Sequence, residues 1–406
     1  MMRRCLLLIA FLFCIGHVAW LEAIGVHNWS SIFNNNPSKN WVVLVAGSYT
    51  WENYRHQADV YHAYRVVRAN KVPAENIITF AYDDIANNPK NPFKGRVFHE
   101  YQHEDVYNGV VIDYRGKDVT PSNFLKVLKG DDKLEANKKK VLKSGPNDNV
   151  FIFFSGHGAT SLIAFQEKEL YAMELNDTLA YMHSKKMFNK LVLYMNACYS
   201  GSMFRDVLPS NMGIYVTTSA NENEQSWGIF CFDKEIDACL ADEYSYDWIL
   251  DSEYNDLKKR TLKQQYDEVK RSTVFSHVMK YGEMALESLP VGKFQGHYDI
   301  LMHRNNRTIA PNAVDGKPSC HAHLFSKSRR LMKAATEEEQ ETAWRKLHRV
   351  LRLSHIVKET FRDIVVVATT HYKPTLKGLS KVDELMCFKA VFDQFRTHCF
   401  TIQQAS

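Results

Sequence analysis

Short apolar runs alternate with helix-like patterns over about the first 250 residues of the chain. The runs that indicate buried strands lie at 41–46, 76–82, 150–154, 191–195 and 214–218. Apolar residues at helical spacing fill 57–70, and "TPSNFLKVLKG" predicts a short helix with Thr120 as its cap and Pro121 at its first position. Strands that are apolar throughout and separated by helices are typical of a parallel sheet covered on both faces. The pattern therefore predicts an α/β fold with a mostly parallel sheet sandwiched by helices.

The pattern changes in the second half of the chain. Residues 256–289 are charged and have helical spacing, and residues 304–319 contain the Pro, Asn and Gly typical of a linker. The capping box "TEEE" at 336–339 then begins a helix with apolar residues along one face, and no strand alternation follows. We therefore expect an all-α C-terminal domain.

Four parts follow from these changes, and the first is a secretory leader. It occupies residues 1–23, where Arg3 and Arg4 precede an apolar run that is too short to span a bilayer. The other parts are the α/β domain at 24–303, a linker at 304–325 and the helical domain at 326–406. Because of this leader we expect a protein of the secretory pathway, and no later apolar run is long enough for a membrane span. The candidate glycosylation sites are Asn28, Asn176 and Asn306.

Cysteine content and charge add two constraints. Six of the eight cysteines lie beyond the leader, at Cys198, Cys231, Cys239, Cys320, Cys387 and Cys399. A secreted protein that reserves one thiol for chemistry would leave an odd number to pair. Residues 24–310 carry 33 Lys and Arg against 35 Asp and Glu, whereas residues 311–406 carry 16 against 10. So mild a basic excess argues against a nucleic-acid partner and suits a tail that lies on the front part of its own chain.

Two of the predicted strands end in reactive residues. "FIFFSGHG" ends in His157, and "LVLYMNACYSGS" brings Cys198 forty-one residues later. The carboxyl ends of parallel strands gather at one edge of a sheet, so we expect these side chains to meet there. A thiol needs a base or a positive neighbour to become a thiolate nucleophile, and His157 would supply it. Backbone N–H groups of Gly158 and Cys198 would bind the developing oxyanion.

Several segments together resemble the legumain family, the asparaginyl endopeptidases. They are "NYRHQAD", "YDDIANNPKNP", "DVTPSNFLKVLKGD", "SGHG", "ACYSGS", "TTSAN" and "FSHVMKYG", within 41–282. "CFKAVFDQFRTHCF" near the end resembles the C-terminal prodomain of that family more weakly. The resemblance implies a caspase-like fold and a cysteine endopeptidase that hydrolyses bonds after Asn, and after Asp in acid. It also implies an acid-activated zymogen with peptide ligation as a side activity.

The resemblance also implies roles for individual residues. His157 and Cys198 form the dyad, Asn53 steadies the histidine, and Gly158 helps to form the oxyanion hole. The pocket for the residue before the cut bond would use Arg55, His56, Asn196, Ser226 and Asp242. Arg55 would bind the carbonyl oxygen of a substrate asparagine and Asp242 its NH2 group, because a side-chain amide both accepts and donates.

Three positions near the expected site depart from the family pattern. This chain has Asn196 where the family has glutamate, Gly156 where it has aspartate, and Tyr199 where it often has glutamate. With a neutral Asn196, Arg55 is less compensated by negative charge. We therefore expect aspartate to be accepted more readily than is usual in the family.

The basic tail is expected to control the site. Its Lys and Arg would pair with carboxylates of the α/β domain at neutral pH, and acid would weaken those pairs. The candidate self-cleavage points are Asn305, Asn306, Asn312 and Asp315. Cys387 and Cys399 match two of the four cysteines of the family prodomain, and the sequence ends at Ser406 before their partners. Either the C-terminus is truncated or this member has lost the last helices.

The resemblance implies further partners and a location. The partners are protein and peptide substrates, the chain's own prodomain as an inhibitor, and inhibitors of the cystatin type. The location is a lysosome, a vacuole or a secreted compartment such as a gut lumen. We expect no cofactor and no metal, because Cys320, His321 and His323 lack the second half of a zinc site.

Two other functions remain open from the sequence. A glycolipid-anchor transamidase catalytic subunit has similar "NYRH" and "GHG" motifs, but it normally carries a membrane-spanning tail. A legumain-like pseudoenzyme would explain Asn196 and Tyr199, although the intact His157 and Cys198 argue against it.

Overall fold

The computed structural model describes residues 38–297, 315–371 and 380–398 of the chain. Its central sheet has seven strands in the order β12-β9-β8-β4-β1-β2-β3. The strands are β1 (Asn40–Ala46), β2 (Ile77–Ala81), β3 (Tyr114–Arg115), β4 (Asn149–Ser155), β8 (Lys190–Asn196), β9 (Ile214–Thr218) and β12 (Met279–Gly282). All neighbouring pairs are parallel except β12 with β9. The predicted mostly parallel sheet is confirmed.

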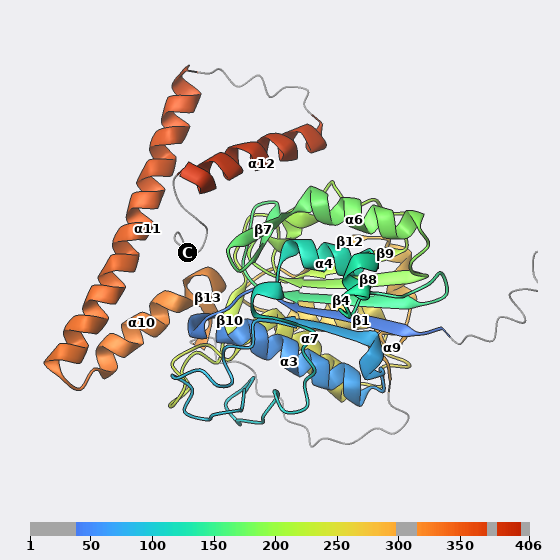
Figure 1. Cartoon of the computed structure of the whole chain (residues 1–406), viewed down its shortest axis with the longest axis horizontal. Coiled ribbons are helices and arrows are strands. Elements are labelled where there is room, and N and C mark those ends of the chain that lie inside the picture. The colour runs from blue at the N-terminus through green and yellow to red at the C-terminus, as the bar shows by residue number, and fades with distance from the viewer. Residues whose placement is uncertain (1–37, 298–314, 372–379, 399–406) are drawn as a thin grey trace, which may run out of the picture. The chain divides into compact units, whose positions relative to one another are not determined.

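Helices cover both faces of this sheet, as Figure 1 shows. Alternate residues of one strand enter two different cores: Val42 and Leu44 pack on one face, and Val43 and Val45 on the other. The first face carries α3 (Tyr54–Ala69), α7 (Glu243–Tyr254), α8 (Leu262–Ser272) and α9 (Gly292–Gln295), and the second carries α4 (Pro121–Leu128) and α6 (Ala172–Ser184). Burial on both faces explains why these strands are apolar throughout.

Local signals determine where the predicted helices begin. Thr120 caps α4 by accepting a hydrogen bond from the Asn123 backbone N–H, and Pro121 is its first residue, as predicted. The predicted helix at 57–70 begins three residues earlier, at Tyr54, and ends at Ala69. The short α5 covers Asp132–Ala136.

One interpretation of the sequence is wrong. Residues 256–289 are not helical throughout, because Met279–Gly282 form β12, which pairs with β9 at the sheet edge. Helical structure there is limited to α8 and a short 3-10 helix at Met284–Ser288. An edge strand with one half-buried face has no long apolar run, so its sequence resembles a charged helix.

Two small sheets lie beside the main one. The first contains β5 (Gly158–Ala159), β6 (Leu162–Phe165) and β7 (Lys168–Tyr171). The second contains β11 (Ala241–Asp242), β10 (Trp227–Ile229) and β13 (Lys317–Pro318), in that order. A strand from the C-terminal half of the chain thus pairs with a strand that follows the Cys198 turn.

The described part of the chain beyond residue 321 is helical, as expected. It contains α10 (Ala322–Lys333), α11 (Glu337–His371) and α12 (Lys381–His398). Thr336 accepts a hydrogen bond from the backbone N–H of Glu339 at the start of α11, as the capping box predicts. In the described part of the chain, no helix has the length and apolar character needed to cross a membrane.

Candidate active site

His157 and Cys198 follow two neighbouring strands of the main sheet. Strands β4 and β8 pair in parallel, with Ser155 opposite Asn196, so the two chain segments leave the sheet at the same level. The turns touch: a Cβ on Gly158 would lie 2.6 Å from the carbonyl oxygen of Cys198. Only glycine allows this approach. The structure therefore brings the two predicted reactive residues to one edge of the sheet.

Asn53 orients the His157 ring. The side-chain oxygen of Asn53 lies 2.8 Å from Nε2 of His157, and the ring meets that of His56 edge-on at 4.9 Å. Nδ1 of His157 is buried and has no hydrogen-bond partner among the described residues. Burial lowers the pKa of His157 to about 3, helped by the positive charge of Arg55 and by His323. The imidazole is therefore neutral in this state and has one nitrogen left for proton transfer.

The Cys198 thiol lies in a buried, polar environment. Its Sγ is 3.7 Å from Oγ of Ser226, and the residue is 1% exposed. The pKa of Cys198 is lowered to about 7, mainly by a side-chain hydrogen bond with Cys320; burial opposes this shift and Ser226 supports it. The hydrogen bonds of the described residues include none between Cys198 and His157.

The expected pocket residues form a buried cluster next to the dyad. Arg55, in the first turn of α3, donates from Nε to Oδ1 of Asp242 at 2.9 Å. The Asn196 side-chain amide donates to the other oxygen of Asp242, also at 2.9 Å. His56 places Nε2 3.4 Å from Asp242, while its Nδ1 lies 2.5 Å from Oγ of Ser48. Arg55 and Asp242 thus present a donor and an acceptor side by side.

Protonation in this cluster is set by burial. Burial raises the pKa of Asp242 to about 8, although Arg55 lowers it; the nearby Asp59 raises it further. Burial also lowers the pKa of His56 well below its usual value, with Arg55 and His157 adding to the effect. The guanidinium of Arg55 is consequently the one fixed positive charge in this group of pocket side chains.

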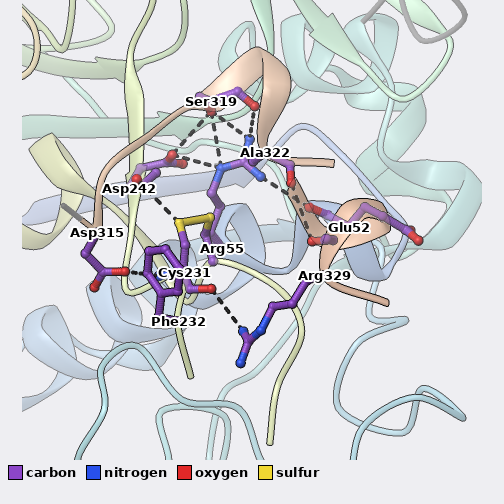
Figure 2. The surroundings of a disulfide bond; sticks show 12 residues. Glu52, Arg55, Cys231, Phe232, Asp242, Asp315, Ser319, Ala322 and Arg329 are labelled. Carbon is purple, nitrogen blue, oxygen red and sulfur yellow. Dashed lines mark hydrogen bonds and ion pairs between the residues drawn. A yellow bond between two sulfur atoms is a disulfide. The ribbon is translucent and has the colours of Figure 1, made fainter. Parts of the chain in front are cut away.

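A segment from the C-terminal half occupies the pocket. Residues 315–333, called here the pocket segment, comprise β13, a 3-10 turn (Ser319–His321) and α10. Ser319 accepts from Nη2 of Arg55 through both Oγ, at 2.6 Å, and its carbonyl oxygen, at 2.9 Å. The same hydroxyl donates to Asp242 at 3.3 Å, and Figure 2 shows Ser319 linked to both side chains. Its backbone N–H donates to the carbonyl of Ser226 at 2.8 Å.

Buried side chains hold the rest of the pocket segment. Asp315 accepts hydrogen bonds from the Cys231 N–H and from the Tyr101 hydroxyl. Arg329 is nine-tenths buried and donates to the carbonyls of Cys231 at 3.1 Å, Ile236 at 3.4 Å and Asp233. The Cys231–Cys239 disulfide fixes the loop that offers these carbonyls, as Figure 2 shows.

The candidate cleavage and glycosylation residues do not belong to the dyad or to the pocket cluster. Asn305, Asn306 and Asn312, the glycosylation candidate Asn28 and the whole leader lie outside the described residues. Cleavage after Asp315 would first require release of its two hydrogen bonds. Asn176 is a poor glycan acceptor in the folded chain, because its amide nitrogen is buried and donates to the carbonyls of Ala172 and Met203.

Sequence reasoning missed three residues of this site. Asp59 is fully buried beneath the pocket and accepts from His99, Ser155 and the backbone N–H of Asp242. Its position four residues after Arg55 on one helix face was a usable signal. Ser319 and Cys320 had no signal beyond the odd number of cysteines, because contacts between distant segments have no local pattern.

Comparisons with known proteins identify the family to which this chain is similar. The Peptidase C13 family matches residues 40–297. The chain is 46% identical to hemoglobinase of Schistosoma mansoni over 92% of this chain and 86% of that protein. It is 42% identical to rat (Rattus norvegicus) legumain over 89% and 84%. It is 38% identical to the vacuolar-processing enzyme delta-isozyme of Arabidopsis thaliana over 88% and 82%.

Proposed function

This chain belongs to the peptidase C13 family and is a cysteine-type endopeptidase, and we propose that it cuts peptide bonds after asparagine using Cys198 and His157. The observation that carries this proposal is the Ser319 hydroxyl in the pocket. It accepts from Arg55 and donates to Asp242, as the amide of a substrate asparagine would do. A site that pairs both polar ends of a side chain rejects residues that lack one of them.

The reaction begins at sulfur. His157 takes the thiol proton of Cys198 through its unpaired nitrogen. The resulting thiolate attacks the carbonyl carbon of the substrate, and the backbone N–H groups of Gly158 and Cys198 stabilise the oxyanion. His157 then gives a proton to the leaving amine, and its bond to Asn53 keeps the ring in place for this step. Water releases the acyl group, and an amine that replaces the water gives the ligation side reaction.

The docked pocket segment supports a zymogen in which residues 326–406 form the prodomain and 304–325 the linker. Ser319 occupies the pocket with its carbonyl oxygen on Arg55, so this carbonyl is not directed at the N–H groups of Gly158 and Cys198. The Ser319–Cys320 peptide bond is therefore not presented for attack. A segment that fills the pocket and resists cleavage acts as an inhibitor.

Acid would release this inhibitor. His323 is half-buried in α10, and its buried Nε2 is unpaired among the described residues; desolvation lowers its pKa to about 4. Asp237 is half-buried too, but hydrogen bonds from Arg330 and Trp51 outweigh its desolvation and hold its pKa below the usual value. Protonation of either group in acid weakens the docking of α10.

Acceptance of aspartate is the finer part of the proposal. Asn196 donates to Asp242 and brings no charge, so the pocket holds one fewer carboxylate than a pocket with glutamate there. With its pKa raised to about 8, Asp242 is mainly uncharged at neutral pH and in acid, so it does not repel a substrate carboxylate in either. Aspartate should therefore be cut well below pH 7, and Asn196→Glu should lower the ratio of Asp to Asn cleavage.

The direct test compares Ala-Ala-Asn, Ala-Ala-Asp and Ala-Ala-Gln fluorogenic peptides before and after incubation near pH 4. Cleavage of the Asn peptide that appears only after acid, and never in Cys198→Ser, is the expected result. Equal cleavage of the Gln peptide, whose amide lies one methylene further from the backbone, would contradict a pocket in which Arg55 and Asp242 are placed for asparagine. Asn cleaved in preference to Asp at every pH between 4 and 7 would remove the expectation about aspartate.

Location and partners follow from the same proposal. The predicted leader and the acid-sensitive docking fit a lysosomal, vacuolar or secreted enzyme, with cystatin-type inhibitors as further partners. No described feature favours the transamidase alternative over an endopeptidase.

A further inference from the structure

We propose that Cys198 and Cys320 form a redox-modification site, in which a disulfide between them blocks the nucleophile until a thiol reductant opens it. The ligand class of this site is a low-molecular-weight disulfide or thiol. The inference rests on the proposed function in one respect only, which is that Cys198 is the nucleophile. The pairing of the two sulfurs is a separate property of the chain.

The backbone of the pocket segment brings Cys320 to Cys198. Pro318 pairs with Trp227 in the small sheet, and the Ser319 N–H donates to the carbonyl of Ser226. Ser226 is also the residue whose hydroxyl contacts the Cys198 sulfur at 3.7 Å. Cys320 follows Ser319 directly in the 3-10 turn, so the backbone places it beside Ser226 and next to Cys198.

Neighbouring contacts fix this arrangement. Ser319 makes three hydrogen bonds to Arg55 on one side of Cys320, and α10 begins at Ala322 on the other. Ala322 is itself buried against the Cys231–Cys239 disulfide. Cys320 is therefore held beside the nucleophile by anchors on both sides, which favours bond formation between them over pairing with distant thiols.

The other described cysteines do not compete. Cys231 and Cys239 already form a disulfide, and Cys387 lies exposed on α12. Cys198 and Cys320 are both free thiols. Interaction between the pair lowers the pKa of Cys198 and raises that of Cys320, so Cys198 is the attacking thiolate and Cys320 the resolving thiol.

The chemistry is an ordinary thiol–disulfide exchange with a disulfide such as oxidised glutathione. The Cys198 thiolate attacks one sulfur of it, breaks its S–S bond and releases one small thiol. Cys320 then loses its proton and attacks the Cys198 sulfur of the mixed disulfide, which releases the second small thiol. Two protein thiols are oxidised, one small disulfide is reduced to two thiols, and excess reductant reverses both steps.

The test uses the full chain at neutral pH with defined mixtures of oxidised and reduced glutathione. Free thiols are blocked with iodoacetamide, and a non-reducing digest is analysed by mass spectrometry. We expect a peptide pair joined through Cys198 and Cys320, and alkylation of Cys198 slowed by at least about tenfold in oxidising mixtures. Activity after acid should then require a thiol reductant.

Two variants make the result specific. Cys320→Ser should abolish the joined pair and leave Cys198 as a mixed disulfide with glutathione, whereas Cys387→Ser should behave as the unaltered chain does. A Cys198 that is alkylated as fast in oxidising as in reducing mixtures would overturn the proposal. So would a Cys198 that carries glutathione in the unaltered chain just as it does in Cys320→Ser, or a bond between Cys198 and Cys387. Thermal melting of both variants checks that they fold.

Failure of the proposed function has a different signature. A joined pair with no peptidase activity after reduction and acid would leave the redox site standing and reject the peptidase assignment for Cys198. Activity that appears after acid in fully oxidising buffer would support the peptidase assignment and reject the redox site.

Discussion

The C-terminal half of the chain contacts the α/β domain in two places, which differ in burial and in chemistry. The pocket segment inserts Ser319 and Arg329 into buried positions and bonds mainly to backbone carbonyls and to Arg55. Helix α12 instead contacts the surface through Lys389 with Glu174 at 2.9 Å and Arg396 with Glu169. Its Asp393 accepts a hydrogen bond from Tyr171 at 2.8 Å.

The two contacts therefore have different effects: the charges of α12 attract the tail to the domain, whereas the pocket segment blocks the active site. Exposed ion pairs such as Lys389–Glu174 contribute about 0–1 kcal/mol each and are screened by salt. In the second α12 pair Glu169 is buried while Arg396 stays about one-third exposed, so this pair is weakened by salt as well, though less. Buried hydrogen bonds to a charged group contribute more, because their loss leaves unpaired groups in a dry interior. The net charge of the tail therefore explains less of the inhibition than the few buried residues of the pocket segment.

The largest effect is expected from Arg329→Ala. The change removes the guanidinium, which leaves three carbonyls without their donor and a cavity in its place. We expect this to weaken docking of the pocket segment by about 3 kcal/mol, which is roughly a hundredfold in the docking equilibrium constant. The measurement is the fraction of chain that cleaves Ala-Ala-Asn at pH 7 without acid treatment, in reducing buffer. Lys333→Ala, an exposed residue in the last turn of the same helix, is the matched control. Equal activity of the two variants would contradict the dominance of the buried contacts.

His323→Gln should give the next largest effect. The variant should need a lower pH than the unaltered chain to become active. The docked pKa of about 4 lies below the usual 6.5, so docking loses stability as pH falls from about 6.5 to 4. At pH 5 protonation of His323 should lower the docking equilibrium constant roughly ten- to thirtyfold. Lys327, Arg55, His321 and Glu52 are the charged and titratable groups that act on His323, and glutamine changes none of them.

The readout for His323→Gln is the pH at which half of the chain becomes active. It should fall by up to about one unit, while His321→Gln, which changes an exposed neighbour, should leave it within a few tenths. An unchanged midpoint in His323→Gln would assign the acid response to carboxylates such as Asp237.

Ser319→Ala should have a smaller effect on docking. It removes the hydroxyl bonds to Arg55 and Asp242 but keeps the carbonyl bond to Arg55, which we expect to cost about 1–2 kcal/mol, or roughly tenfold. The rate of alkylation of Cys198 at neutral pH in reducing buffer measures exposure of the site. A rate equal to that of Ser328→Ala on α10 would show that Ser319 does not hold the segment in the pocket.

The smallest effect is expected from α12. The double variant Lys389→Ala/Arg396→Ala removes two partly exposed ion pairs, so activity at pH 7 should rise by no more than a few-fold. The dependence of activation on salt between low and physiological ionic strength should weaken in this variant. A hundredfold rise in activity would instead give the tail the role that we assign to the pocket segment.

The sequence determined the parts of this protein that have a local pattern. Strands buried on both faces must be apolar throughout, which identified five of the seven strands of the main sheet. Parallel strands share one carboxyl edge, so His157 and Cys198 could be expected to meet. The cap of α4 at Thr120 follows equally from local hydrogen bonding.

Only the tertiary structure decided which distant segments meet at that edge. Ser319 and Cys320 reach the pocket through β13, a strand of two residues whose pairing with β10 has no periodicity to detect. Asn176 matches a glycosylation tripeptide, yet packing of α6 buries it. Side-chain burial and long-range pairing depend on the whole chain. The same local sequence can therefore form a linker or a segment that occupies an active site.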